Sequence, residues 1–228
     1  FNDKKISFKI KFTRLFVYSL IRFFNKNVDS FYCQSLSVKN QLKSAFRGIN
    51  VKIMPFFNDS ELKNLSYSKK NVFKYDFFYP ATADVHKNFD RLYSAIAIIS
   101  KERKISVCVT IDKKSLKYTK QIDEINKKLK YEAVVNLGRV DKKKVLDTFL
   151  LSKALIFPSL EESLGLPLIE SAIISCPIIG SDLPFIYSVV ENPIVFNPLN
   201  PKDIADKMNR FLDGEYENIS QKNKINNR

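Results

Sequence analysis

The sequence has little histidine, cysteine and glycine, and each shortage excludes a class of site. One histidine and three cysteines without a Cys-x-x-Cys pair leave no His-rich or Cys-rich metal site. An odd number of widely spaced cysteines argues against a disulfide framework, so a reducing compartment is expected. No Asp-x-Asp pair of the kind that holds a metal-bound diphosphate occurs. We therefore expect no metal and no cofactor.

Long hydrophobic runs are lacking as well. The most apolar early stretch, from Leu15 to Phe24, is interrupted by Arg22 and is far shorter than the ~20 residues that span a bilayer. No signal-peptide pattern precedes it, and the chain begins at Phe1 without a methionine. We expect a cytoplasmic protein, and we expect the sequence given to be a fragment of a larger one.

Positive charge is abundant, with a formal net charge of +14. Such an excess points to anionic partners: nucleic acid, nucleotides or an anionic membrane surface. A non-enzymatic module that binds nucleic acid would need its lysines on one face, beside aromatic platforms. Here they fall in short clusters spread over many predicted helices, such as 113–114, 127–128 and 142–144. Solvated helix faces are the simpler interpretation, and no nucleic-acid partner is expected.

The first third of the chain predicts a small set of elements followed by a linker. Residues 58–72 are polar and lysine-rich with no clear period, which is typical of a linker. The helices predicted before it span 9–26 and 35–46, and the strands span 30–33 and 51–54.

From residue 74 onward, short apolar strands alternate strictly with helices. The strands are predicted at 74–79, 104–111, 133–137, 154–157, 177–180 and 194–196, and the helices at 88–101, 115–129, 141–152, 164–175, 183–190 and 201–212. This alternation predicts an α/β fold with a doubly wound, Rossmann-like parallel sheet, which binds ligands at the carboxyl ends of its strands. Gly138, Gly165 and Gly180 are expected just beyond strand ends on that edge, for close approach to a ligand or for tight turns.

The segment 157–170 carries the clearest chemical pattern. It reads Phe-Pro-Ser-Leu-Glu-Glu-Ser-Leu-Gly-Leu-Pro-Leu-Ile-Glu, with Glu162 and Glu170 eight positions apart. Pro167 near the first helical turn leaves the N–H groups around 164–166 unpaired, and these form an anion site suited to a diphosphate. At ~1.5 Å per helical residue the two glutamates lie up to ~12 Å apart, which is too far for both to contact one atom.

This segment closely resembles the signature of retaining GT-B glycosyltransferases of family four, also called glycosyl transferases group 1. Matching pieces continue through Ser171-Ala172, 177–184 and 196–198 to the helix at 201–212. The resemblance implies that Glu162 contacts sugar hydroxyls and Glu170 the ribose hydroxyls. It also places the intervening residues in the donor site: Ser163, Leu164, Gly165 and Leu166.

A second matching piece is 78–88, where the family places a lysine that neutralises the donor diphosphate. Lys87 matches that lysine, with His86 beside it. Thr82 stands where many members carry an arginine, so one expected cation is missing. Gly138 and Val140 match a loop near the nucleobase, less specifically.

The resemblance implies that residues 1–72 are the remnant of an amino-terminal acceptor domain with its linker, and that 73–228 form the nucleotide-sugar donor domain. The fold expected is thus a GT-B carboxy-terminal domain with a partial second Rossmann-like domain. Lys87 and Glu162 are the expected catalytic residues of a hexosyltransferase. It would transfer sugar from a nucleotide-diphosphate sugar to a saccharide or lipid-linked acceptor hydroxyl with retention, in bacterial surface polysaccharide synthesis. A sugar-nucleotide epimerase on the same fold is the alternative, disfavoured by the spacing of the glutamates.

The helix predicted at 9–26 has two interpretations. Lys11, Arg14 and Arg22 form a basic stripe beside a phenylalanine-rich face, which is typical of a helix lying on the inner face of an anionic membrane. Ordinary core packing of the same apolar face is the interpretation that the sequence favours.

Overall fold

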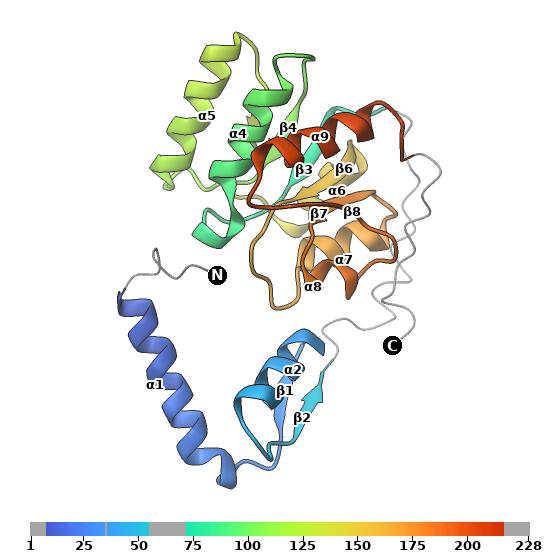
Figure 1. The fold of residues 1–228 in the computed structure, drawn as a ribbon. Coiled ribbons are helices and arrows are strands. Elements are labelled where there is room, and N and C mark those ends of the chain that lie inside the picture. The colour runs from blue at the N-terminus through green and yellow to red at the C-terminus, as the bar shows by residue number, and fades with distance from the viewer. Residues whose placement is uncertain (1–7, 35, 55–71, 217–228) are drawn as a thin grey trace. The chain divides into compact units, whose positions relative to one another are not determined.

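A computed structural model of the chain describes residues 8–34, 36–54 and 72–216 (Figure 1). The chain divides into two compact units, Phe1–Phe56 and Phe57–Arg228. All but Val72 of the linker predicted at 58–72 lies outside the described residues.

The first unit contains a small parallel β-α-β arrangement. Its elements in chain order are α1 (Phe8–Phe24), the 3-10 turn η1 (Asn25–Asn27), β1 (Phe31–Cys33), α2 (Leu36–Ala45) and β2 (Val51–Ile53). The strands β1 and β2 pair in parallel. Tyr18 of α1 stacks on Phe46 with ring centroids 4.7 Å apart and donates to the carbonyl of Ala45 at 3.2 Å. This arrangement agrees with the partial Rossmann-like domain that the sequence predicts.

The second unit is a six-stranded, wholly parallel sheet. Its strands are β3 (Tyr75–Tyr79), β4 (Val107–Val109), β5 (Val134–Asn136), β6 (Ser152–Phe157), β7 (Ile178–Ser181) and β8 (Ile194–Phe196). Its helices are the 3-10 turn η2 (Val85–Lys87), α4 (Phe89–Ile99), α5 (Leu116–Leu129), α6 (Lys142–Leu150), α7 (Leu166–Ile173), α8 (Pro184–Tyr187) and α9 (Pro201–Leu212). The predicted Rossmann-like fold is confirmed.

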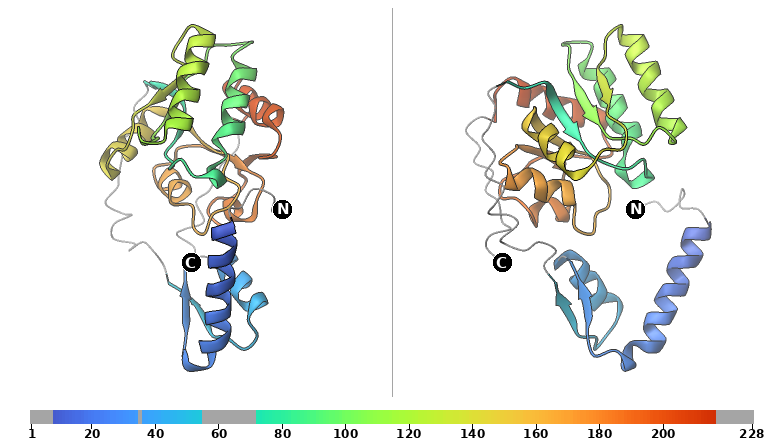
Figure 2. Two further views of the ribbon diagram at one scale, coloured as in Figure 1. Left: turned by 90° about the vertical axis from the view of Figure 1, so that its left-hand side faces the viewer. Right: turned by 180° about the vertical axis from the view of Figure 1, so that it is seen from behind.

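The strand order is β5-β4-β3-β6-β7-β8. The direction in which the chain winds through the sheet reverses between β3 and β6, which is the topological switch point. From β3 the chain winds outward through β4 to β5, then crosses back to β6 and winds outward through β7 to β8. Helices α4, α5 and α9 lie on one face of the sheet, and α6 and α7 on the other (Figures 1 and 2). The loops after β3 and β6 therefore leave the same edge side by side, where sheets of this kind bind ligands.

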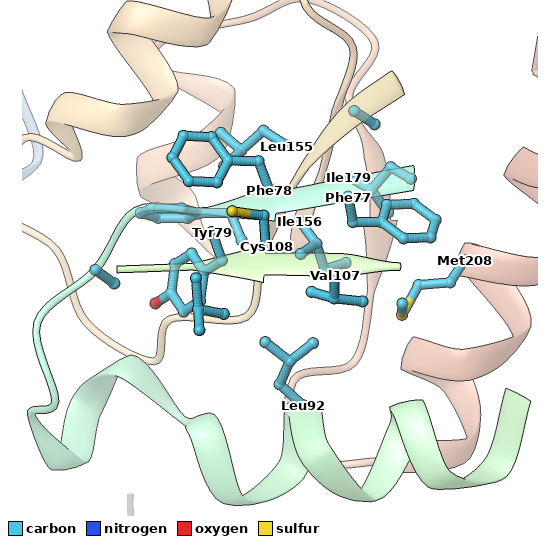
Figure 3. Close-up of a cluster of buried hydrophobic side chains, with 14 of the residues drawn as sticks. Phe77, Phe78, Tyr79, Leu92, Val107, Cys108, Leu155, Ile156, Ile179 and Met208 are labelled. Atoms are coloured by element: carbon cyan, nitrogen blue, oxygen red, sulfur yellow. The ribbon is translucent and has the colours of Figure 1, made fainter. Parts of the chain in front are cut away.

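The core is centred on β3 and β6. Phe77, Phe78 and Tyr79 have no exposed surface, and Leu155 and Ile156 of β6 lie beside them (Figure 3). Consecutive side chains on a strand point to opposite faces, so burial of all three in β3 means that both faces are covered. Each buried phenylalanine contributes about 1.5–3 kcal/mol of transfer free energy.

Strand β4 is shorter than the predicted 104–111, because side chains occupy the backbone groups at both ends. Before the strand, the N–H of Ser106 donates to the carboxylate of Asp76 at 2.8 Å. After it, the N–H of Ile111 donates to Oδ1 of Asn136 at 2.9 Å. An N–H group that donates to a side chain is not available for hydrogen bonds between strands. The apolar run in the sequence is therefore longer than the strand.

Gly180 lies inside β7, whereas the sequence places it just beyond a strand end. A Cβ there would collide with Cδ1 of Ile186 and come within 3.3 Å of the Phe157 carbonyl oxygen. Close packing of α8 and β6 on this strand therefore explains the glycine, in place of a tight turn or an approach to a ligand.

Candidate functional site

Two predicted site residues, 75 positions apart in sequence, meet at the edge where β3 and β6 end. The Nζ of Lys87 and Oε1 of Glu162 are 2.6 Å apart, and the two side chains are 14% and 10% exposed. Lys87 ends η2, in the loop that follows β3, and Glu162 lies in the loop between β6 and α7. A salt bridge this deeply buried requires that both loops be held firmly, because an unpaired charge here would be strongly destabilising.

The backbone of Lys87 is fixed from both sides. Its N–H donates to the carbonyl of Asp84 at 3.0 Å, and its carbonyl accepts from the Tyr79 hydroxyl at 3.1 Å. Burial, and then the negative charge of Glu162, raise the pKa of Tyr79 well above its usual value. The phenol therefore stays protonated and remains a donor.

A second set of bonds ties the two loops together through the backbone carbonyl of His86. This oxygen accepts from the N–H of Leu160 at 2.7 Å and from Oγ of Ser159 at 3.2 Å. Ser159 has no exposed surface. The His86 side chain is half-buried, and the bonds that tie the loops together are made by its main-chain carbonyl.

The start of α7 differs from the predicted 164–175. The helix begins at Leu166, because Gly165 adopts a left-handed conformation with φ of 70°. A Cβ at Gly165 would also approach Cδ1 of Leu168 to 2.9 Å. At the other end Ser175 has φ of 55°, two residues past the last helical residue. The helical rise therefore applies from Leu166 to Glu170, whereas Glu162 lies in the loop before the helix and its distance from Glu170 does not follow from helix geometry.

The first turn of α7 presents backbone donors at this edge. Pro167 occupies the first turn, and the carbonyl of Gly165 accepts from the N–H groups of Leu168 and Ile169 at 2.9 and 3.3 Å. Earlier N–H groups of a helix have no partner within the helix, and the helix dipole makes this end positive. Among the remaining predicted donor-site residues, Ser163 and Leu166 are exposed and Leu164 is half-buried.

Glu170 lies on α7 in a partly buried position. Burial raises the pKa of its carboxyl, and the positive charge of Lys142 opposes that rise. Lys142 is the first residue of α6, directly after the turn that carries Gly138 and Val140. The positive charge at the start of α6 therefore acts on the predicted ribose-binding carboxylate.

The turn at Gly138 is fixed by one carboxamide. Gly138 has φ of 69°, and its N–H donates to Oδ1 of Asn136 at 3.0 Å. The Nδ2 of Asn136 donates to the Ile111 carbonyl at 3.0 Å, which joins this turn to the end of β4. Val140 is half-buried.

Thr82 makes its described contact within its own loop. The hydroxyl donates to Oδ2 of Asp84 at 2.5 Å, and the residue is exposed. The structure does not join it to Lys87 or Glu162 by any hydrogen bond among the described residues.

Sequence reasoning assigned no role to three buried polar residues that hold the site together. Tyr79, Asn88 and Ser159 are each at most 3% exposed. Asn88 and Ser159 direct hydrogen bonds between the loops that follow β3 and β6, and Tyr79 directs one from the end of β3 to the loop that follows it. Tyr79 and Ser159 are polar residues at or just after an apolar strand end, a signal that the sequence offers, whereas Asn88 lies well past the end of β3.

A cavity of about 550 Å³ lies at the opposite edge of the sheet. Its lining includes Ser152, Ile178 and Ile194, which begin β6, β7 and β8. It is therefore separate from the Lys87–Glu162 site. Within the described ranges, no three His, Cys, Asp or Glu residues are grouped so as to hold a metal ion. No described helix has the length and apolarity needed to cross a membrane.

The doubly wound sheet, with a lysine and a glutamate at its switch point and helix amides beside them, defines the class: a Rossmann-like α/β domain, in which ligands bind at the carboxyl ends of the strands. The model of the family glycosyl transferases group 1 matches residues 63–228, and the chain belongs to that family. The resemblance of the 157–170 segment is thereby confirmed for GT-B glycosyltransferases of this group.

Solved structures share the fold at low identity. Sucrose-phosphate synthase from Thermosynechococcus elongatus is 16% identical over 93% of this chain and 54% of its own, with a TM-score of 0.70. A variant of S. aureus TarM, in complex with fondaparinux, alpha-GlcNAc-glycerol and UDP, is 16% identical over 83% and 38%, with a TM-score of 0.69. The E. coli trehalose-6-phosphate structure bound with UDP-2-fluoro glucose is 12% identical over 81% and 53%, with a TM-score of 0.64.

The chain thus spans between 38% and 54% of the length of these three proteins. A search of curated proteins found no match.

Proposed function

We propose that this chain carries the donor-binding part of a retaining glycosyltransferase of family four. The observation that carries the proposal is the buried contact between Lys87 and Glu162 at the switch point of the sheet. A cation for a departing diphosphate and a carboxylate for sugar hydroxyls need to be adjacent, because the two groups of the donor are joined by one bond. Family membership and the two UDP-containing neighbours support the same donor class.

In the proposed reaction the bond between the sugar's anomeric carbon and the diphosphate oxygen breaks, and a bond to the acceptor hydroxyl oxygen forms. The proton of that hydroxyl passes to the departing diphosphate. Lys87 and the amides at the start of α7 stabilise the negative charge that develops on the diphosphate. Glu162 orients the sugar through its hydroxyls, and Glu170 binds the ribose. The acceptor is a saccharide or a lipid-linked saccharide, as in bacterial surface polysaccharide synthesis.

Calorimetric titration of the 228-residue chain with UDP, GDP and ADP tests the proposal. One of the three is expected to bind with a single site, and at 100 times its Kd to raise the free energy of unfolding by about 2.7 kcal/mol. An equal absence of binding for all three would contradict the proposed donor class.

Replacing Glu170 with alanine is expected to weaken binding of that nucleotide by about 1–3 kcal/mol, the usual loss for hydrogen bonds to a charged group. Burial removes part of the water around the Glu170 carboxylate and raises its pKa. Ribose hydroxyls would give this carboxylate hydrogen bonds in place of that water. Calorimetry measures the difference. Glu124→Ala, on the exposed face of α5, is the matched control and should leave Kd unchanged. Unchanged affinity in Glu170→Ala would remove Glu170 from the site.

We propose that transfer needs no metal, because a lysine and helix amides supply the positive charge that a metal would otherwise bring to the diphosphate. Turnover of the full-length protein in EDTA is expected to equal that in Mg²⁺. Loss of activity in EDTA that added Mg²⁺ restores would refute this part of the proposal.

We further propose that α1 holds the protein on the cytoplasmic face of an anionic membrane. Residues 1–56 contain eleven Lys and Arg against two Asp, so they carry nine of the fourteen net positive charges. Exposed apolar side chains gather on the described part of the helix: Leu15, Phe16, Val17, Leu20, Phe23 and Phe24. Basic charge beside exposed aromatic side chains favours the headgroup region of anionic lipid.

Co-sedimentation with vesicles measures this. Binding to anionic vesicles should exceed binding to neutral ones by more than about tenfold at low salt. It should fall sharply in Leu15→Ser/Phe23→Ser, whose side chains are 64% and 79% exposed in the wild type. Equal and negligible binding to both vesicles would support packing of this face inside a protein.

A further inference from the structure

Three strand-end loops meet on the side chain of one residue, Asn88. Its Nδ2 donates to the carbonyl of Pro158 at 3.0 Å and to the carbonyl of Pro198 at 2.8 Å. Its Oδ1 accepts from Nη1 of Arg91 at 2.9 Å. Pro158 follows β6 and Pro198 follows β8, while Asn88 follows η2 in the connection from β3 to α4. Both amide protons are therefore used to join separate segments of the chain.

The local backbone explains why asparagine is suited to this place. Asn88 has φ of 62° and ψ of 32°, at the junction where the turn η2 ends and the helix α4 begins. Asparagine tolerates the left-handed region better than other residues with a Cβ. Glycine would also adopt it but would leave the two proline carbonyls without their donor. The residue is 3% exposed, so those carbonyls would have little access to solvent.

Asn88 is adjacent to Lys87, whose carbonyl is held by the Tyr79 hydroxyl on its other side. Tyr79 lies at the end of β3, has no exposed surface, and cannot move without disturbing the core. The carboxamide and the phenol thus fix the main chain of Lys87 against the loop that presents Glu162. A flexible lysine side chain gains precision when its backbone is fixed in this way.

We propose that Asn88 and Tyr79 are positioning residues that hold the Lys87 ammonium in the place where the donor diphosphate binds. This inference rests on the proposed function, because it assigns these residues a purpose through Lys87. It goes beyond that function in naming two residues that need not touch the donor themselves.

The test is a double-mutant cycle on the 228-residue chain, read as the Kd of UDP, GDP or ADP, whichever binds the wild type most tightly. Asn88→Gly keeps the left-handed backbone and removes the carboxamide, and it should weaken binding about tenfold. Tyr79→Phe keeps the packing and removes one hydrogen bond, and it should weaken binding about threefold. In a Lys87→Ala background, each should add less than about twofold, because no ammonium is left to position.

Asn126→Ala is the matched control. The Asn126 carboxamide also clamps a strand, with its Nδ2 and Oδ1 bonded to the carbonyl and N–H of Val134 at 2.9 and 3.0 Å. It lies at the amino end of β5, away from the site, so its loss should lower thermal stability without changing Kd. If Asn88→Gly does not fold, Tyr79→Phe alone carries the cycle.

The outcomes separate the inference from the function beneath it. If Lys87→Ala weakens binding but Asn88→Gly and Tyr79→Phe do not, the positioning role is wrong and the proposed function stands. Effects of equal size with and without Lys87 would also overturn it, since they would reflect the fold in general. If Lys87→Ala itself leaves Kd unchanged, Lys87 is not at the diphosphate, and both proposals fail.

Discussion

Replacing Lys87 with alanine is expected to lower the turnover of the full-length protein by more than about tenfold, in a protein that still folds but has a lower thermal midpoint, because Glu162 loses its partner. Lys87 is the cation that the structure brings beside Glu162, and Thr82 supplies no second one in the same loop. Without that ammonium, the helix amides are what remains of the two groups proposed to stabilise the leaving diphosphate. The rate is measured with donor and acceptor at saturation, and the fold is checked by the thermal midpoint.

The structure offers a matched control for this substitution. Lys117 pairs with Asp90 at 2.8 Å, a salt bridge of similar length, but the side chains are 60% and 53% exposed. Exposed pairs contribute about 0–1 kcal/mol to stability, so Lys117→Ala should change neither the midpoint nor the turnover appreciably. Near-normal rates in purified Lys87→Ala would mean that the diphosphate is held elsewhere.

Glu162→Gln is expected to separate binding from transfer. Without nucleotide, Glu162 occupies the Nζ of Lys87, and a diphosphate must compete with it for that ammonium. Removing the negative charge while keeping the shape frees Lys87, so UDP, GDP or ADP should bind severalfold more tightly. Transfer should fall by more than about a hundredfold, because an amide cannot hold the sugar as the carboxylate does.

The two glutamates of the motif thus have opposite expected effects on nucleotide affinity. Glu170→Ala should weaken binding, whereas Glu162→Gln should strengthen it. Calorimetry on the two variants side by side reads the signs directly. Weaker binding in Glu162→Gln would show that the carboxylate organises the empty site more than it competes for Lys87.

The alternation of strands and helices is predictable from sequence because a parallel strand buried on both faces reads as an unbroken apolar run. The Phe77-Phe78-Tyr79 run of β3 is such a case. Strand ends are less predictable. The apolar pattern continues past β4 on both sides. The N–H of Ser106 donates to Asp76 of β3, 30 residues away, and the N–H of Ile111 donates to Asn136 of β5, 25 residues away, and these bonds end the ladder.

The motif residues of the site are predictable by resemblance, but their contacts are not. Lys87 and Glu162 are 75 residues apart, and they meet because β3 pairs with β6. The apolar pattern of six similar strands does not specify that pairing. The start of α7 shows the same limit. The apolar pattern allows the helix to begin at Leu164, and the left-handed conformation of Gly165, which sets the start at Leu166, is seen only in the folded loop.

The buried polar residues are the part of the site that is least predictable from sequence. Asn88 bonds carbonyls 70 and 110 residues away, and nothing local distinguishes it from an ordinary helix-start asparagine. Its importance becomes visible when the three loops are seen together, since the left-handed backbone and the two proline carbonyls coincide at that position.

The most direct test of the account is a crystal structure of the chain with the nucleoside diphosphate that binds most tightly. We predict the diphosphate between the Nζ of Lys87 and the amides at the start of α7, with the ribose hydroxyls on Glu170 and the Lys87–Glu162 salt bridge opened. Nucleotide bound in the cavity at the amino edge of the sheet, with that salt bridge intact, would contradict it.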